Sequence, residues 1–167
     1  MGSPNQQEAQ GTWDRSTALT VKRNIITGAT TLTTAQSGSL CVWNSATGYT
    51  FTLPTITADT IGTWFDFQVQ VTNTATACKV ITASASTFIV GSVHTLVIAT
   101  TPGANPGPKG FAFDGTTHVA CTMGGSDTTA GGVTGTRIRL EALSSTLWAI
   151  SGTIYGAGTI VTPAATS

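Results

Sequence analysis

Charge is the scarcest property of this 167-residue sequence. Lysine and arginine number 7, aspartate and glutamate also number 7, and together they make up only 8% of the chain. In ordinary globular domains, charged residues make up about a quarter of the chain. A formal net charge of zero argues against a nucleic-acid binder that works through a basic face. Because 40% of the residues are hydrophobic, the composition also differs from that of a disordered chain.

Long apolar runs and paired cysteines are missing as well. No segment approaches the roughly 18 apolar residues that a membrane-spanning helix needs, so we expect no membrane association. Residues 1–10 are polar and do not resemble a signal peptide, which predicts synthesis in the cytoplasm without export by the general secretory route. Cys41, Cys78 and Cys121 are odd in number and far apart. This pattern favours buried free thiols over a disulfide scaffold.

Helix signals are also lacking, whereas strand signals recur along the chain. Apolar residues at spacings of three and four are not sustained, and threonine makes up about a fifth of the residues. The clearest strand is 64–71, where Trp64 and Asp66 fall on one face and Phe65 and Phe67 on the other. Further strands are predicted at 18–26, 39–44, 49–53, 78–82, 87–90, 94–99, 111–113, 116–122, 137–143, 147–150 and 153–155.

This spacing predicts an all-β fold: an antiparallel β-sandwich of jelly-roll-like form, or a β-barrel. We divide the chain into an extended N-terminal arm (1–17), one β domain (18–155) and a C-terminal tail of small residues (156–167). Two hairpins are expected within the domain. One turns at Asp114-Gly115, and the other joins the strands 137–143 and 147–150.

Groups suited to catalysis are few. His118 and Asp114 could belong to a Ser–His–Asp arrangement, but no G-x-S-x-G elbow is present. His118 and Cys121 are the closest soft metal ligands, and residues three apart on a strand point to opposite faces. No dinucleotide-binding or metal-binding motif occurs. We therefore predict a protein that is not an enzyme, with no catalytic residue, no cofactor and no metal site.

The composition favours assembly instead, because the buried centres of protein interfaces are depleted in charge and enriched in aromatics. A polar arm can add a strand to the sheet edge of a neighbour. We predict partner contacts at Trp13, Asp14 and Arg15 in the arm and at Trp64 in the domain. For the tryptophans of the domain (Trp43, Trp64 and Trp148), packing in the core is the alternative.

Several runs resemble a pattern found in small structural proteins of tailed bacteriophages. They are Thr30–Gly38, Ser45–Pro54 and Gly62–Val69, which match the form TLTAADSG…AAGxTVTLP…GxxFxFxV. The runs Gly135–Glu141 and Leu147–Gly152 resemble the family's ending, GDxxELxxxxxxWxVSG. Together they cover most of residues 30–152. Thr136 stands where the family usually has an acidic residue, and the loop 102–108 is unusually rich in proline.

The resemblance to head decoration (cement) proteins implies a non-enzymatic virion component on the outer surface of the capsid. Such proteins are typically trimeric caps that clamp neighbouring major capsid subunits, often through an N-terminal arm. The expected partners are therefore the major capsid protein and further copies of the chain, as a homotrimer. Two alternatives remain: a fibre or receptor-binding module at the virion surface, and a small β-fold enzyme or carbohydrate-binding module.

Overall fold

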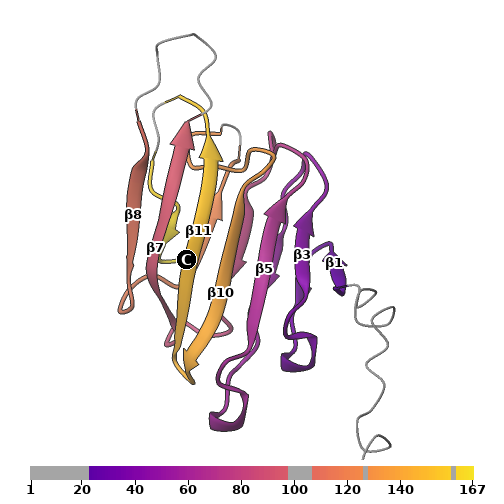
Figure 1. Cartoon of the computed structure of the whole chain (residues 1–167), viewed down its shortest axis with the longest axis vertical. Coiled ribbons are helices and arrows are strands. Elements are labelled where there is room, and N and C mark those ends of the chain that lie inside the picture. The colour runs from indigo at the N-terminus through magenta and orange to yellow at the C-terminus, as the bar shows by residue number, and fades with distance from the viewer. Residues whose placement is uncertain (1–22, 98–106, 126–127, 159–160) are drawn as a thin grey trace, which may run out of the picture.

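A seven-stranded sheet forms one layer of the computed structural model, which describes residues 23–97, 107–125, 128–158 and 161–167. Figure 1 shows this sheet face-on. Its strands, in spatial order, are β1 (Ile25–Thr27), β3 (Leu40–Trp43), β5 (Trp64–Val69), β10 (Arg137–Ser144), β11 (Leu147–Gly156), β7 (Phe88–Val97) and β8 (Lys109–Asp114).

A five-stranded sheet packs behind the first. Its spatial order is β12 (Ala164–Ala165), β9 (Ala120–Met123), β6 (Cys78–Ile81), β4 (Thr50–Thr52) and β2 (Thr30–Thr31). The helical residues of the described chain form two short 3-10 turns, η2 (Thr34–Gln36) and η3 (Ala58–Thr60). No helix in the described ranges is long and apolar enough to cross a bilayer. The all-β fold predicted from the sequence is confirmed.

The first six strands alternate between the two sheets. β1, β3 and β5 are parallel neighbours in the seven-stranded sheet, and β2, β4 and β6 are parallel neighbours in the five-stranded sheet. After each strand, the chain crosses to the opposite sheet and then returns. The returning strand lies beside the earlier strand of its own sheet and runs in the same direction. Both sheets are therefore mixed, with antiparallel pairing concentrated around β8, β9, β10 and β12. The predicted antiparallel pairing thus holds for only part of the sandwich, because the alternation between sheets makes β1 to β6 parallel.

Two similar corners carry the chain from one sheet to the other. In the first, the backbone N–H of Thr33 donates to the Gln36 side chain at 2.9 Å, and Gly38 follows with φ 84°. In the second, the N–H of Thr57 donates to the Thr60 hydroxyl at 2.9 Å, and a glycine with φ 86° again follows. Each corner thus ends on a residue type that accepts a left-handed backbone without strain.

The two predicted hairpins had different outcomes. β10 and β11 pair as an antiparallel hairpin, as expected. The hairpin at Asp114-Gly115 is wrong, because β8 pairs with β7 while β9 lies in the other sheet. The turn there redirects the chain between layers. The predicted strands 87–90 and 94–99 belong to the single strand β7, and the segment 156–167 contributes β12 beside β9.

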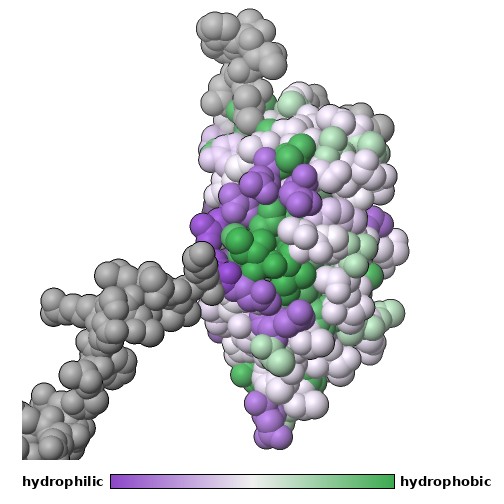
Figure 2. All heavy atoms as spheres, turned by 90° about the vertical axis from the view of Figure 1, so that its right-hand side faces the viewer, coloured by the Kyte–Doolittle hydropathy of each residue, from purple (hydrophilic) through white to green (hydrophobic). Residues whose placement is uncertain are grey.

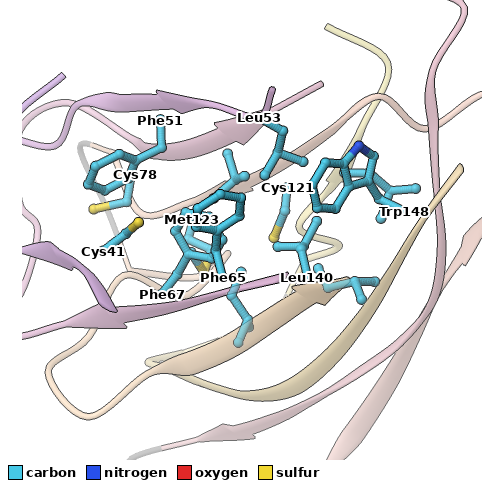
Figure 3. Packing of buried hydrophobic residues seen from close by; sticks show 14 of the residues in the cluster. Cys41, Phe51, Leu53, Phe65, Phe67, Cys78, Cys121, Met123, Leu140 and Trp148 are labelled. Carbon is cyan, nitrogen blue, oxygen red and sulfur yellow. The ribbon is translucent and has the colours of Figure 1, made fainter. Parts of the chain in front are cut away.

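Aromatic side chains fill the space between the sheets (Figure 3). Trp43, Phe51 and Phe67 form a mutual cluster with ring centroids 5.2 to 5.8 Å apart. The three cysteines are buried free thiols, as predicted, and lie among these hydrophobic residues. Burial raises the pKa of each of these thiols to about 12. They are therefore protonated and unreactive in the folded protein at neutral pH.

Candidate functional site

Asp66 is a carboxylate on the outer face of β5 that is shielded from water. Only 3% of the residue is exposed, because three arginine side chains cover it. Arg139 on β10 binds both carboxylate oxygens, at 2.7 and 3.1 Å. Arg137, on the same face of β10, donates to Oδ2 at 3.1 Å. Arg23 precedes β1 and donates to Oδ2 at 2.7 Å.

Strand register brings these groups together. Arg139 lies directly opposite Asp66 in the antiparallel pairing of β5 with β10, and Arg137 lies two residues away on the same face. Arg23 is held by two further bonds, from Nε to the carbonyl oxygen of Gly38 at 3.0 Å and from a terminal nitrogen to that of Ser39 at 3.1 Å. Arg23 thus links the start of β1 to the middle of the sheet.

Opposing influences act on the pKa of Asp66. Burial alone would raise the pKa of this carboxyl, but the hydrogen bonds from Arg139, Arg23 and Arg137 outweigh burial. The pKa is held well below its usual range, so the group stays ionised. Hydrogen bonding to Asp66 likewise raises the pKa of the Arg139 guanidinium. The site is a permanently charged cluster and not a general acid or base near neutral pH.

Trp64 lies on the same face, between two of the arginines. The guanidinium carbon of Arg139 is 4.2 Å from the centre of the indole ring, and that of Arg23 is 5.2 Å away. Both are within the range of cation–π attraction. Glu141 is opposite Trp64 across the β5–β10 pair and interacts electrostatically with Arg139. The cluster therefore combines three guanidinium groups with two carboxylates, leaving an excess of one positive charge.

An open groove of about 460 Å³ lies beside the cluster, over β10 and β11. Arg137 and Arg139 form one side of this groove, and Ser151 and Thr153 line it from the neighbouring strand. The arginines are only partly covered, with 58% of the Arg137 side chain and 48% of the Arg139 side chain exposed. This groove is a place where an anionic group of a partner can reach both guanidinium groups.

Of the residues predicted to contact partners, those that the structure describes lie in different environments. Trp13, Asp14 and Arg15 lie outside the described residues. Trp64 is half-buried within the arginine cluster, at the surface where a partner can reach its neighbours. Trp43 and Trp148 are fully buried, so the core alternative is the correct one for these two.

Asp114 and His118, which the sequence analysis considered for catalysis, do lie together, but they form a turn. The Asp114 carboxylate accepts the N–H groups of Thr116 at 2.9 Å and Thr117 at 2.8 Å, and also the Thr117 hydroxyl. The hydroxyl bond contributes most to holding the pKa of Asp114 well below its usual range. The His118 Nδ1 atom accepts a hydrogen bond from the backbone N–H of Asp114 at 3.1 Å. Both side chains therefore bond to the backbone of their own turn and stabilise it.

The arginine cluster was the feature that sequence reasoning missed. The sequence places Asp66 on the polar face of a strand but contains no signal for its partners, which are 43 to 73 residues away. The one available hint was the alternation of Arg137, Arg139 and Glu141 along a predicted strand. Within the described residues, no group of three histidine, cysteine or acidic side chains lies close enough together to hold a metal ion.

Comparison with known proteins adds no further assignment, since no family model, curated protein or solved structure matches this chain.

Proposed function

We propose that this chain is a structural protein of a tailed-phage virion that decorates the outer surface of the mature head and clamps neighbouring major capsid subunits. The sequence resemblance over most of residues 30–152 motivates this assignment. The observation that carries it is the open end of the sandwich at β1. There both sheets end on strands with no second neighbour among the described residues, β1 in one sheet and β2 in the other.

The β1 end of the molecule exposes apolar residues at a sheet edge. Isolated proteins usually guard such an edge against pairing with another chain. Ile25 on β1 is 63% exposed, and none of the three residues of β1 carries a charge that would discourage pairing with another chain. Figure 2 shows a hydrophobic patch on this side of the molecule, bordered by hydrophilic residues. At the opposite end, the edge strand β8 carries Lys109 and Asp114. This contrast supports the β1 end as the proposed surface for another chain.

The proposed partners are the major capsid protein and two further copies of this chain, in a homotrimer. A protein that binds only the expanded shell stabilises that shell by mass action, and many copies multiply the effect. This role needs no catalytic group. An arginine cluster whose charges stay constant near neutral pH is consistent with such a role.

The test uses heads of the encoding phage that were produced without this protein. Purified chain should co-sediment with expanded heads and raise the temperature at which they release DNA, and light scattering should show a trimer. Ile25→Lys should weaken binding, because it places a charge at the uncovered edge. Ile61→Lys is the matched control, since Ile61 is 50% exposed but lies at the second corner. Failure of the unaltered protein to bind expanded heads would reject the proposal.

A fibre module is the second candidate, and the winding of β1 to β6 favours it. Alternation between two sheets with parallel stacking is the geometry of β-solenoid stalks. A fibre module would bind host cells or their glycans and leave the heat stability of heads unchanged. Labelled protein applied to both cells and heads therefore separates the two functions.

A further inference from the structure

The groove beside Asp66 has hydrogen-bonding groups that form no bond within residues 23–97, 107–125, 128–158 and 161–167. Two nitrogens of Arg139 donate hydrogen bonds to Asp66. All three nitrogens of Arg23 donate hydrogen bonds, one to Asp66 and two to backbone carbonyl groups. Arg137 differs, because it makes a single bond to Asp66 through one terminal nitrogen. A guanidinium has five N–H donors, so most of those on Arg137 point into solvent or the groove.

Two hydroxyl groups face the same groove from the neighbouring strand. Ser151 is paired with Arg139 and Thr153 with Arg137 across the β10–β11 ladder, so each hydroxyl lies beside a guanidinium. Neither side chain makes a hydrogen bond with another described residue. Gly152 between them has φ 144°, and a Cβ there would lie 2.3 Å from the carbonyl oxygen of Arg137. The close approach of β11 to β10 thus requires glycine at this position.

The charge of the cluster restricts the class of ligand. Three guanidinium groups face two carboxylates, Asp66 and Glu141, so one positive charge is uncompensated. A single carboxylate would neutralise this excess, whereas a phosphate dianion would leave the site negative beside Glu141. Arg139 already binds the Asp66 carboxylate in a forked geometry, and Arg137 donates one bond to the same carboxylate.

We propose that the groove formed by Arg137, Arg139, Ser151 and Thr153 binds one aspartate or glutamate side chain of a partner protein. Arg137 supplies the charge-assisted hydrogen bonds, and the two hydroxyls orient the second carboxylate oxygen. The outer face of the sheet beyond the groove carries Ser92 on β7 and Ala112 on β8 in the same row. These small side chains allow a partner to approach closely. The site does not depend on whether that partner is a capsid subunit.

The test is an NMR titration of the full chain with a capped peptide of four glutamates, with the glutamine peptide as the neutral control. The glutamate peptide should shift the Nε–Hε signals of Arg137 and Arg139 and the amide signals of Ser151 and Thr153 in a saturable manner. Arg137→Gln should weaken binding about tenfold, the usual scale for one charge-assisted bond. Lys109→Gln removes the same charge at the far edge of the sheet and should change affinity less than about twofold.

A second variant guards against loss of the fold in Arg137→Gln. Thr153→Val removes a groove hydroxyl and leaves Asp66 and its three arginine partners in the sequence. It should weaken binding of the glutamate peptide severalfold while the signals of residues outside the groove are retained. Inorganic phosphate is titrated in parallel. Phosphate binding in the groove as tightly as the peptide would overturn the carboxylate assignment. Unsaturable shifts, or equal losses in Lys109→Gln and Arg137→Gln, would overturn the site itself.

Discussion

At the scale of single residues, Asp66 shows how one buried charge organises a surface. Its carboxylate is acceptable in a water-poor position because three guanidinium groups provide four hydrogen bonds. The same bonds fix the positions of Arg137 and Arg139 along the groove. A buried ion pair of this type is costly to break from one side, since the remaining charges lose their partner.

We expect Asp66→Asn to lower the free energy of unfolding by about 2–4 kcal/mol at pH 7, because three half-exposed arginines then lose their counter-charge. Urea denaturation followed by tryptophan fluorescence measures the change. Asp59→Asn is the control, because Asp59 is exposed on η3. That variant should lie within about 0.5 kcal/mol of the unaltered protein. Equal stability of the two variants would show that the cluster contributes nothing to the fold.

The pH dependence of this difference has a defined sign. The pKa of Asp66 is lower in the folded state than in the unfolded chain, so protons bind preferentially to the unfolded state. Its stabilising contribution is complete above about pH 5 and is lost as the pH falls through the unfolded value of about 3.9 toward the folded value. The stability gap between the unaltered protein and Asp66→Asn should therefore shrink between pH 5 and pH 2, as urea midpoints at each pH would reveal.

At the scale of elements, the pairing of β10 with β11 depends on backbone proximity at Gly152. A side chain at this position would meet the carbonyl oxygen of Arg137 and the Cα of Ile138 at 2.3 and 2.7 Å. Gly91 on β7 has a similar relation to Ile150 on β11, at 2.3 Å. The backbones of β10 and β7 thus each lie close to β11 at a glycine. The groove lies over the first of these two places, at Gly152.

Gly152→Ala should destabilise the protein by about 2–4 kcal/mol, because strain at φ 144° adds to the clash with β10. Gly110→Ala in β8 is the matched control. No atom lies within 4 Å of its added Cβ and its φ is not positive, so a change within about 1 kcal/mol is expected. Thermal unfolding of both variants provides the measurement. A Gly152→Ala variant as stable as Gly110→Ala would contradict the close approach of the strands.

The sequence predicted elements well where the signal is local. The alternation of Trp64, Phe65, Asp66 and Phe67 identified β5 and its two faces, and the run 137–150 identified the β10–β11 hairpin. The turn at Asp114-Gly115 misled the prediction, because the same residues can reverse a strand or send the chain to the other sheet. Which of these occurs depends on the partner that β8 finds, and that partner is β7.

At the scale of the whole molecule, the described residues form one hydrophobic core between the two sheets. The hydrophobic cluster between the sheets begins at Leu32, with Ile26 packed against it, and extends to Ile154. Within the part of the chain that the structure describes, the sheet residues run from Ile25 onward. We therefore predict that the arm proposed for partner binding can be removed without loss of these elements.

Deletion of residues 1–17 should leave a folded β domain whose unfolding free energy differs from that of the full chain by less than about 1 kcal/mol. Circular dichroism and urea denaturation test the fold, and co-sedimentation with expanded heads tests the arm. We expect head binding to fall severalfold, because the shortened chain no longer has the arm that would add a strand to the sheet edge of its partner. Unchanged head binding after the deletion would argue against a grasping role for the arm.

The sequence by itself determined the all-β class, the burial of the three thiols and the two faces of β5, because each follows from composition or a period of two residues. The tertiary structure alone decided that Asp66, Arg23, Arg137 and Arg139 form one charged cluster and that the β1 and β2 edges lie at the same end. These relations join residues far apart in the chain. They arise from strand order and register, which depend on the summed packing of both sheets and not on any local run of residues.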